Sequence, residues 1–161
     1  MSGINVSRVI LGGIVAGIVY DLLDFLVDDV WLGAHWAAGL KALGHSGAMT
    51  NAQLIEFNLI GIAGGIMAVW LYAAIRPRYG AGLRTAACAG IAVWILAFVL
   101  PNISFMYVTG LFGRRLTAAT TFGALIEVVV STIAGAALYR EVESAAVHSA
   151  ASAAPKQAVR T

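Results

Sequence analysis

Residues 9–31 read V-I-L-G-G-I-V-A-G-I-V-Y-D-L-L-D-F-L-V-D-D-V-W, and this stretch decides the fold of the chain. Its length matches the roughly 20 apolar residues that a helix needs to cross a bilayer. The stretch also contains four carboxylates, and each costs at least about 2.5 to 3.5 kcal/mol at the bilayer centre on insertion scales. The four are Asp21, Asp24, Asp28 and Asp29. The sequence therefore predicts a membrane-spanning helix that carries an acidic stripe.

Three further apolar stretches pass the same length test. They run from Leu54 to Ile75, from Thr85 to about Tyr107, and from Leu116 to Tyr139. Two of the links between these spans are too short to hold a soluble domain. The longer link, residues 33–51, contains tryptophan and basic residues and predicts an interfacial half-helix, because Trp is enriched at headgroup depth. The predicted fold class is all-α, a bundle of four transmembrane helices.

The composition supports a membrane protein. Of the 161 residues, 60% are hydrophobic and only 11% are charged, which fits neither a soluble domain nor a disordered chain. The net charge of +2 is small, and the arginines lie at the ends of apolar runs rather than in a basic patch. Nucleic-acid binding is therefore excluded. The lone Cys88 cannot form an intrachain disulfide, and we interpret it as a packing residue.

Basic residues predict the orientation, because they are enriched in cytoplasmic loops. With both termini inside, seven lie on the cytoplasmic side and three on the outer side. The seven are Arg8, Arg76, Arg78, Arg84, Arg140, Lys156 and Arg160, and the three are Lys41, Arg114 and Arg115. Residues 1–140 are predicted to form the membrane domain. Residues 141–161 lack the large apolar side chains needed to offset the entropy of ordering them, so they are predicted to be a disordered cytoplasmic tail.

An internal repeat is indicated when the chain is compared with itself at a shift of 71 residues. Leu54-Ile55-Glu56 then matches Leu125-Ile126-Glu127, and Ile62-Ala63-Gly64 matches Ile133-Ala134-Gly135. Small apolar helices also match by chance. If the duplication is real, the protein consists of two tandem helical hairpins, about 8–76 and 84–140, related by an axis along the membrane normal. Glu56 and Glu127 would then be symmetry mates.

Helical geometry suggests where the acidic residues point. At about 100° per residue, Asp21, Asp24 and Asp28 share an arc of about 80° with Gly13 and Gly17. The pairs Gly13/Gly17 and Gly61/Gly65 are G-x-x-x-G patterns, which predict close helix packing. This face of the first span should therefore point at protein. In the third span, Pro101 removes a backbone donor and predicts a kink.

Several carboxylates at close range in a dry site cannot all ionise, so some should hold protons or share a cation. The first hypothesis is therefore a proton or cation pathway or carrier. Its site residues are Asp21, Asp24, Asp28, Glu56 and Glu127, with the hydroxyls of Thr120 and Ser131 as auxiliary ligands. Under a structural alternative, the same acids form hydrogen bonds between helices and contribute about 0.6 to 2 kcal/mol each.

The second hypothesis is a non-catalytic scaffold or an accessory subunit of a larger membrane complex, or a homo-oligomer. An enzyme is less favoured, since the chain has no H-E-x-x-H, G-x-S-x-G or phosphate-loop motif. No cofactor is predicted. His35 and His45 are the candidates for a metal site with Asp28 or Asp29, although interfacial histidines are usually only solvated.

Three segments carry a resemblance to known proteins. They are R-V-I-L-G-G-I-V-A-G at Arg8 to Gly17, W-L-Y-A-A-I-R-P-R at Trp70 to Arg78, and A-G-A-A-L-Y-R-E at Ala134 to Glu141. With them, residues 8–141 resemble the uncharacterised small four-span integral membrane proteins of bacteria. The resemblance implies a location in the bacterial inner membrane. It implies no activity, ligand or site residue.

Overall fold

The structure is a computed structural model, and it describes residues 3–141. The predicted tail lies outside these residues except for Glu141. All of the secondary structure in the described residues is helical. It consists of five α-helices and three π-helical segments, which are labelled η. In order they are α1 (Val6–Asp24), η1 (Phe25–Trp31), α2 (Gly33–Ala42), α3 (Asn51–Tyr79), α4 (Leu83–Trp94), η2 (Ile95–Val99), η3 (Asn102–Val108) and α5 (Arg114–Ala136).

Four helical segments are long and apolar enough to cross a membrane. They are Val6–Trp31, Asn51–Tyr79, Leu83–Val108 and Arg114–Ala136, with 26, 29, 26 and 23 residues. By helix length and hydropathy, the chain is a multi-pass membrane protein. The predicted fold class is confirmed, since these helices pack as a bundle. The helix predicted between residues 33 and 51 is α2.

Local signals explain where the helices begin and end. The Asn5 side chain accepts a hydrogen bond from the Arg8 backbone N–H at 3.2 Å and caps the start of α1. A capping box formed by Thr50 and Gln53 begins α3. Gly80 ends α3 at φ 85°, a left-handed conformation that glycine adopts without steric cost. These caps extend α3 beyond the predicted apolar limits at both ends.

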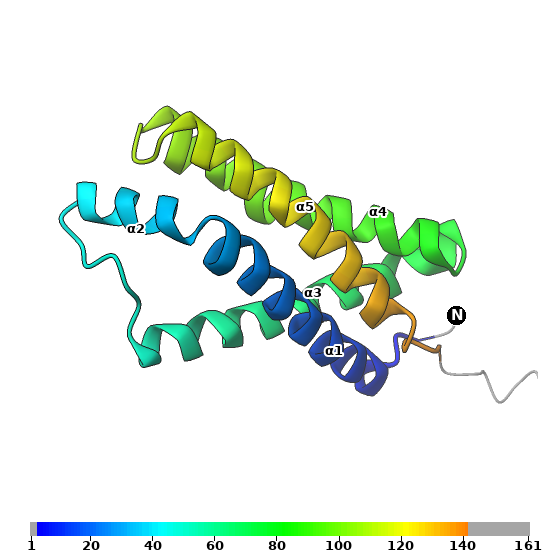
Figure 1. Ribbon diagram of the computed structural model, residues 1–161. Helices are drawn as coiled ribbons and strands as arrows, with labels where there is room; N and C mark the ends of the chain where they lie inside the picture. The colour runs from blue at the N-terminus through cyan, green and yellow to red at the C-terminus, as the bar shows by residue number, and fades with distance from the viewer. Residues whose placement is uncertain (1–2, 142–161) are drawn as a thin grey trace, which may run out of the picture.

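Helix α1 packs against both α3 and α5, and α4 packs along α5. Figure 1 shows α5 lying between α1 and α4. Glycines permit the closest approaches. A Cβ added to Gly65 would lie 2.5 Å from the backbone oxygen of Gly13, and one added to Gly12 would lie 2.6 Å from that of Gly135. Because backbone atoms cannot move aside as flexible side chains can, larger residues would force these helices apart.

The bundle has two unlike ends, which we call the Tyr139 end and the α2 end. The Tyr139 end contains the start of α1, the α3–α4 turn and the end of α5, while the opposite end contains α2 (Figure 1). The hydrophobic core lies toward the Tyr139 end. It consists of Val9, Ala16, Val69, Tyr72, Ala73, Ala86, Ala89, Ala136 and Tyr139.

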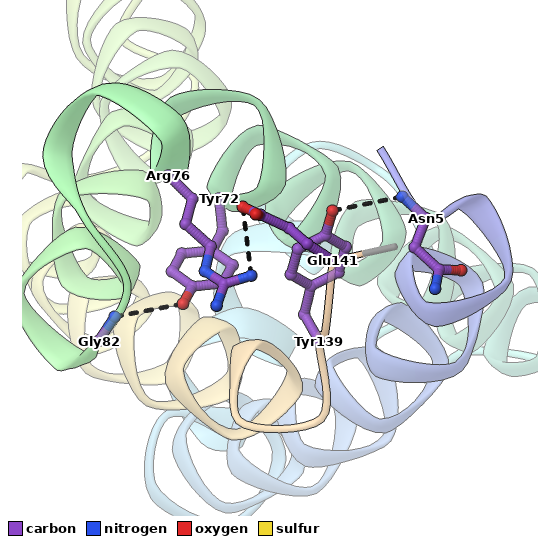
Figure 2. Close-up of polar contacts among 6 residues, drawn as sticks. All are labelled: Asn5, Tyr72, Arg76, Gly82, Tyr139 and Glu141. Atoms are coloured by element: carbon purple, nitrogen blue, oxygen red, sulfur yellow. Dashed lines mark hydrogen bonds and ion pairs between the residues drawn. The ribbon is translucent and has the colours of Figure 1, made fainter. Parts of the chain in front are cut away.

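A group of polar contacts, here named the Tyr139 clasp, joins four parts of the chain at that end (Figure 2). Its members are Asn5, Tyr72, Arg76, Gly82, Tyr139 and Glu141. Arg76 forms an ion pair with Glu141 at 3.3 Å and lies 5.5 Å from the Tyr139 ring centroid. The Tyr139 hydroxyl accepts a hydrogen bond from the Asn5 backbone N–H at 3.3 Å, and the Tyr72 hydroxyl accepts one from the Gly82 N–H at 3.3 Å.

The α2 end is packed more loosely. All ten residues from Asn51 to Ile60 are exposed, and in Figure 1 this part of α3 diverges from α1 and α2. Segments η1 and η3 also lie at this end. Pro101, where the sequence predicts a kink, lies between η2 and η3. Because Pro101 has no backbone N–H, the regular α-helical bonding cannot continue through it.

Candidate functional site

Glu127 lies on α5 and is the most enclosed ionisable group of the described chain. Its residue surface is only 1% exposed. Neither carboxyl oxygen has a hydrogen-bond partner among residues 3–141. Buried polar groups are nearly always hydrogen-bonded, and each exception needs an explanation. Glu127 is therefore the centre of the candidate site.

Asp24 lies at the end of α1 and is half-buried. The Tyr20 hydroxyl donates a hydrogen bond to Asp24 Oδ1 at 3.0 Å. The two residues are four positions apart, so they share one face of α1. The pattern of acidic residues did not identify Tyr20 as part of the site. Its spacing of four residues from Asp24 is the sequence feature that could have done so.

Asp28 lies in η1 and accepts a hydrogen bond from a side chain of α2. The Trp36 indole Nε1–H donates to Asp28 Oδ1 at 2.9 Å. Trp36 also packs edge to face against Phe112, with ring centroids 5.1 Å apart. The π-helical turn inserts an extra residue per turn, so Asp28 is rotated from its place in an uninterrupted α-helix. The sequence did not predict the turn or the Trp36 contact.

Asp24, Asp28 and Glu127 lie close enough for their charges to interact. Glu127 interacts electrostatically with Asp24 and Asp28, and these two also interact with each other. The α5 helix contacts η1 at this point, where a Cβ added to Gly123 would lie 2.7 Å from Val27 Cγ1 and 3.3 Å from Glu127 Oε1. No Lys or Arg occurs in the sequence between Arg8 and Lys41 or between Arg115 and Arg140. These three carboxylates therefore have no basic partner on their own spans.

The other predicted acids differ in position, and Asp21 and Asp29 also interact electrostatically with Asp24. Asp21 is half-buried and faces α3, where a Cβ added to Gly61 would collide with its carboxylate. Glu56 is exposed and, at about 100° per residue, lies on the side of α3 opposite to Gly65. Asp29 is exposed at the α2 end. Of the other four acids in the predicted site, Asp24 and Asp28 are the ones whose charges interact with Glu127.

The two predicted auxiliary hydroxyls differ. Thr120 is buried on the same face of α5 as Glu127, and its Oγ1 has no hydrogen-bond partner within the described residues. Ser131 is also buried, but its hydroxyl donates to the Val128 carbonyl of its own helix at 3.1 Å. The Thr120 hydroxyl could therefore bind a ligand, whereas the Ser131 hydroxyl already donates its proton to the Val128 carbonyl.

A second polar contact joins α5 to the third span. Trp94 Nε1 donates to the Thr121 carbonyl at 2.7 Å, and Asn102 Nδ2 donates to Thr121 Oγ1 at 2.8 Å. Such interhelical bonds hold helices together in a bilayer. The sequence pattern does not predict this contact, although Asn102 is a polar residue inside an apolar run.

The histidine candidates do not form a metal site with the acids. His35 and His45 are both exposed. Over residues 3–141, no group of three or more His, Cys, Asp or Glu side chains could hold a metal ion.

Comparison with known proteins does not assign a family. The chain matches no family model, no curated protein and no solved structure. The predicted resemblance to small four-span bacterial proteins therefore stays a prediction.

Proposed function

We propose that the protein binds and releases a proton or a cation at an intramembrane carboxylate site formed by Glu127, Asp24 and Asp28, and so serves as a pathway or carrier. The observation that carries the proposal is the pair of buried, unpartnered oxygens on Glu127. Ionisable residues inside spans are costly and typically mark ion or proton pathways. A positively charged ligand, or a proton, would remove the uncompensated charge.

The neighbouring acids strengthen the argument. Asp24 and Asp28 each accept one hydrogen bond, from Tyr20 and Trp36, so their positions are held by side chains from two helices. Like charges at close range oppose each other's ionisation. Three carboxylates without a basic partner therefore favour uptake of positive charge. Asp21, Thr120 and Ser131 remain predicted contributors, and Thr120 is the best placed of them to act as a ligand because its oxygen has no hydrogen-bond partner among the described residues. Glu56 is exposed on α3 and is not part of the proposed site.

The proposed location is the bacterial inner membrane, with both termini in the cytoplasm. The distribution of basic residues, seven against three, supports this orientation. It places the Tyr139 end on the cytoplasmic side and the α2 end outside. Asp28 and Asp29 would then face the outer side of the membrane.

A flux measurement tests the proposal. The purified full-length protein is reconstituted in liposomes, and proton and cation flux are compared among the wild type, Glu127→Gln and Asp24→Asn. Glu56→Gln is the matched control, because Glu56 also follows Leu-Ile in the sequence but its side chain on α3 is exposed. We expect both site variants to lower the flux at least tenfold and the control to keep it. Wild-type flux in Glu127→Gln, or no flux in any protein, would contradict the proposal.

A second function, a scaffold or an accessory subunit, is favoured by one observation. The exposed residues 51–60 of α3 include Glu56, and acids within spans usually face protein or water rather than lipid. Another protein, or a second copy of this chain, could cover that face. Native mass spectrometry of the solubilised protein would detect a stable partner, and Glu56→Leu should then weaken its retention.

A further inference from the structure

We propose that the ligand of the Glu127 site is a proton rather than a metal ion, and that it reaches Glu127 from the α2 end. This inference rests on the proposed function and names its substrate and its direction of entry. It follows from three features of the site: the number of available ligands, the charges around Glu127, and the packing on its two sides.

The site offers few ligands for a metal ion. Magnesium and calcium take six or more oxygen ligands, several of them from carboxylates or water. Asp24 Oδ1 and Asp28 Oδ1 already accept hydrogen bonds from Tyr20 and Trp36. No group of three metal-binding side chains is found in residues 3–141. A proton, in contrast, needs one oxygen and no coordination shell.

Glu127 is also enclosed, with only 1% of its surface exposed. Two surface cavities of about 380 and 300 Å³ are lined almost entirely by apolar groups, and Glu127 lines neither of them. The first lies between α1 and α3 near Val9 and Trp70, and the second lies near Tyr72 and Ala136. Glu127 instead packs beside Gly123 and Val27. Such a position suits a proton better than a hydrated ion.

The charges that face Glu127 are all acidic or neutral. From α1 and η1 come Tyr20, Asp24 and Asp28, which interact with it electrostatically. The third span carries no charged residue between Arg84 and Arg114, and on α3 Glu56 lies on the exposed side. Among residues 3–141, no cation is paired with the Glu127 carboxylate, and protonation removes its charge without a counter-ion.

The two routes to Glu127 differ in the acidic residues that lie along them, since α5 has buried residues on both sides of Glu127. Toward the Tyr139 end, Thr132 is 0% exposed with its hydroxyl bonded to the Val128 carbonyl at 2.6 Å. The hydrophobic core and the Tyr139 clasp lie beyond it (Figure 2). Toward the α2 end, Asp24 and Asp28 are half-buried and Asp29 is exposed. Carboxylates therefore lead from that surface to Glu127.

Infrared spectroscopy tests the identity of the ligand. The carboxylic acid C=O band of Glu127 is assigned by its loss in Glu127→Gln and its retention in Glu56→Gln. We expect the band at neutral pH, its disappearance at high pH, and no change when sodium, potassium, magnesium or calcium is added at constant pH. Thermal unfolding checks that both variants are folded.

Different failures of this experiment have different meanings. Loss of the band on adding a metal ion at constant pH would overturn the proton assignment and leave the proposed cation site standing. Absence of the band at every pH would overturn the proton assignment as well. The proposed function itself fails if Glu127→Gln keeps wild-type flux in liposomes, or if the wild type shows no flux at all.

Cysteine labelling tests the direction of entry. Val27→Cys and Thr132→Cys, each combined with Cys88→Ser, are treated with a membrane-impermeant maleimide in sealed vesicles of both orientations. Ser46→Cys and Ala81→Cys are exposed markers for the α2 end and the Tyr139 end. We expect Val27→Cys to react only from the side of Ser46→Cys, and Thr132→Cys from neither side. Labelling of Thr132→Cys from the side of Ala81→Cys, or none of Val27→Cys, would overturn the route.

Discussion

Glu56 of α3 and Glu127 of α5 follow the same two residues, Leu-Ile, yet their surroundings are opposite. Glu127 is 1% exposed and Glu56 lies in a stretch of ten exposed residues. The helices differ in the same way: half of the most apolar stretch of α5 is buried, against 17% for α3. Both helices contact three other α-helices, and the difference arises because the α2 end of α3 diverges from the bundle. Similar local sequence therefore does not imply a similar electrostatic environment.

The same contrast occurs between two adjacent glycines of α3. Gly65 faces α1, and a Cβ there would lie 2.5 Å from the Gly13 backbone oxygen. Gly64 has open space around its Cβ position. One residue of rotation, about 100°, separates a helix contact from the outer surface. These pairs allow matched tests of the comparison.

The largest effect is expected from Gly65→Leu. The side chain would overlap the α1 backbone, so we expect a loss of more than about 3 kcal/mol or a failure to fold. Thermal unfolding in detergent, followed by circular dichroism, measures the loss. Gly64→Leu is the control and should stay within about 0.5 kcal/mol of the wild type. Equal losses in the two variants would contradict the assigned packing face.

A gain in stability is expected from Glu127→Met. The substitution removes a buried polar group whose oxygens are unpartnered, and such groups cost about 1 to 3 kcal/mol. The melting temperature should therefore rise, while flux through the site is lost. Glu56→Met, on the exposed side of α3, should change stability by less than about 0.5 kcal/mol. A lower melting temperature for Glu127→Met would mean that the carboxylate has a stabilising partner.

The smallest effect concerns the Tyr139 clasp. Tyr139→Phe keeps the ring contacts with Tyr72 and Arg76 but removes the hydroxyl that accepts the Asn5 N–H. We expect a loss of about 0.5 to 1.5 kcal/mol, the usual net value of one hydrogen bond. Tyr79→Phe provides an exposed control. Hydrogen exchange at the Asn5 amide should increase in Tyr139→Phe alone.

Much of the fold could be predicted from residue patterns. The four spans were placed within a few residues of their observed bounds, because a bilayer imposes a minimum apolar length on each helix. The largest deviations are at α3, which the Thr50 cap and Gly80 extend beyond the apolar run. At α5, the helix ends at Ala136 rather than at the predicted Tyr139, because the last turn tightens as Tyr139 N–H bonds to the Ala136 carbonyl.

The candidate site was less predictable. A uniform 100° per residue placed Asp21, Asp24 and Asp28 on one stripe, but η1 changes the rotation after Asp24. Asp21 faces α3, and Asp24 and Asp28 are held by Tyr20 and Trp36. Trp36 comes from α2, a separate helix, and no periodicity within α1 reveals it. The predicted internal repeat, which would make Glu56 and Glu127 equivalent, stays a prediction.

The sequence by itself determined that the chain crosses a membrane four times and that acids lie within its spans, because both depend on the cost of moving side chains from water into hydrocarbon. Only the tertiary structure decided which acids meet and which are buried. Helix rotation, the π-helical turn and the close approaches at glycine depend on contacts between segments far apart in the chain. A local pattern such as G-x-x-x-G indicates close helix packing but does not say which helix is the partner. For this reason Glu127 is enclosed with no hydrogen-bond partner in the described part of the chain, while Glu56 remains on the outer surface.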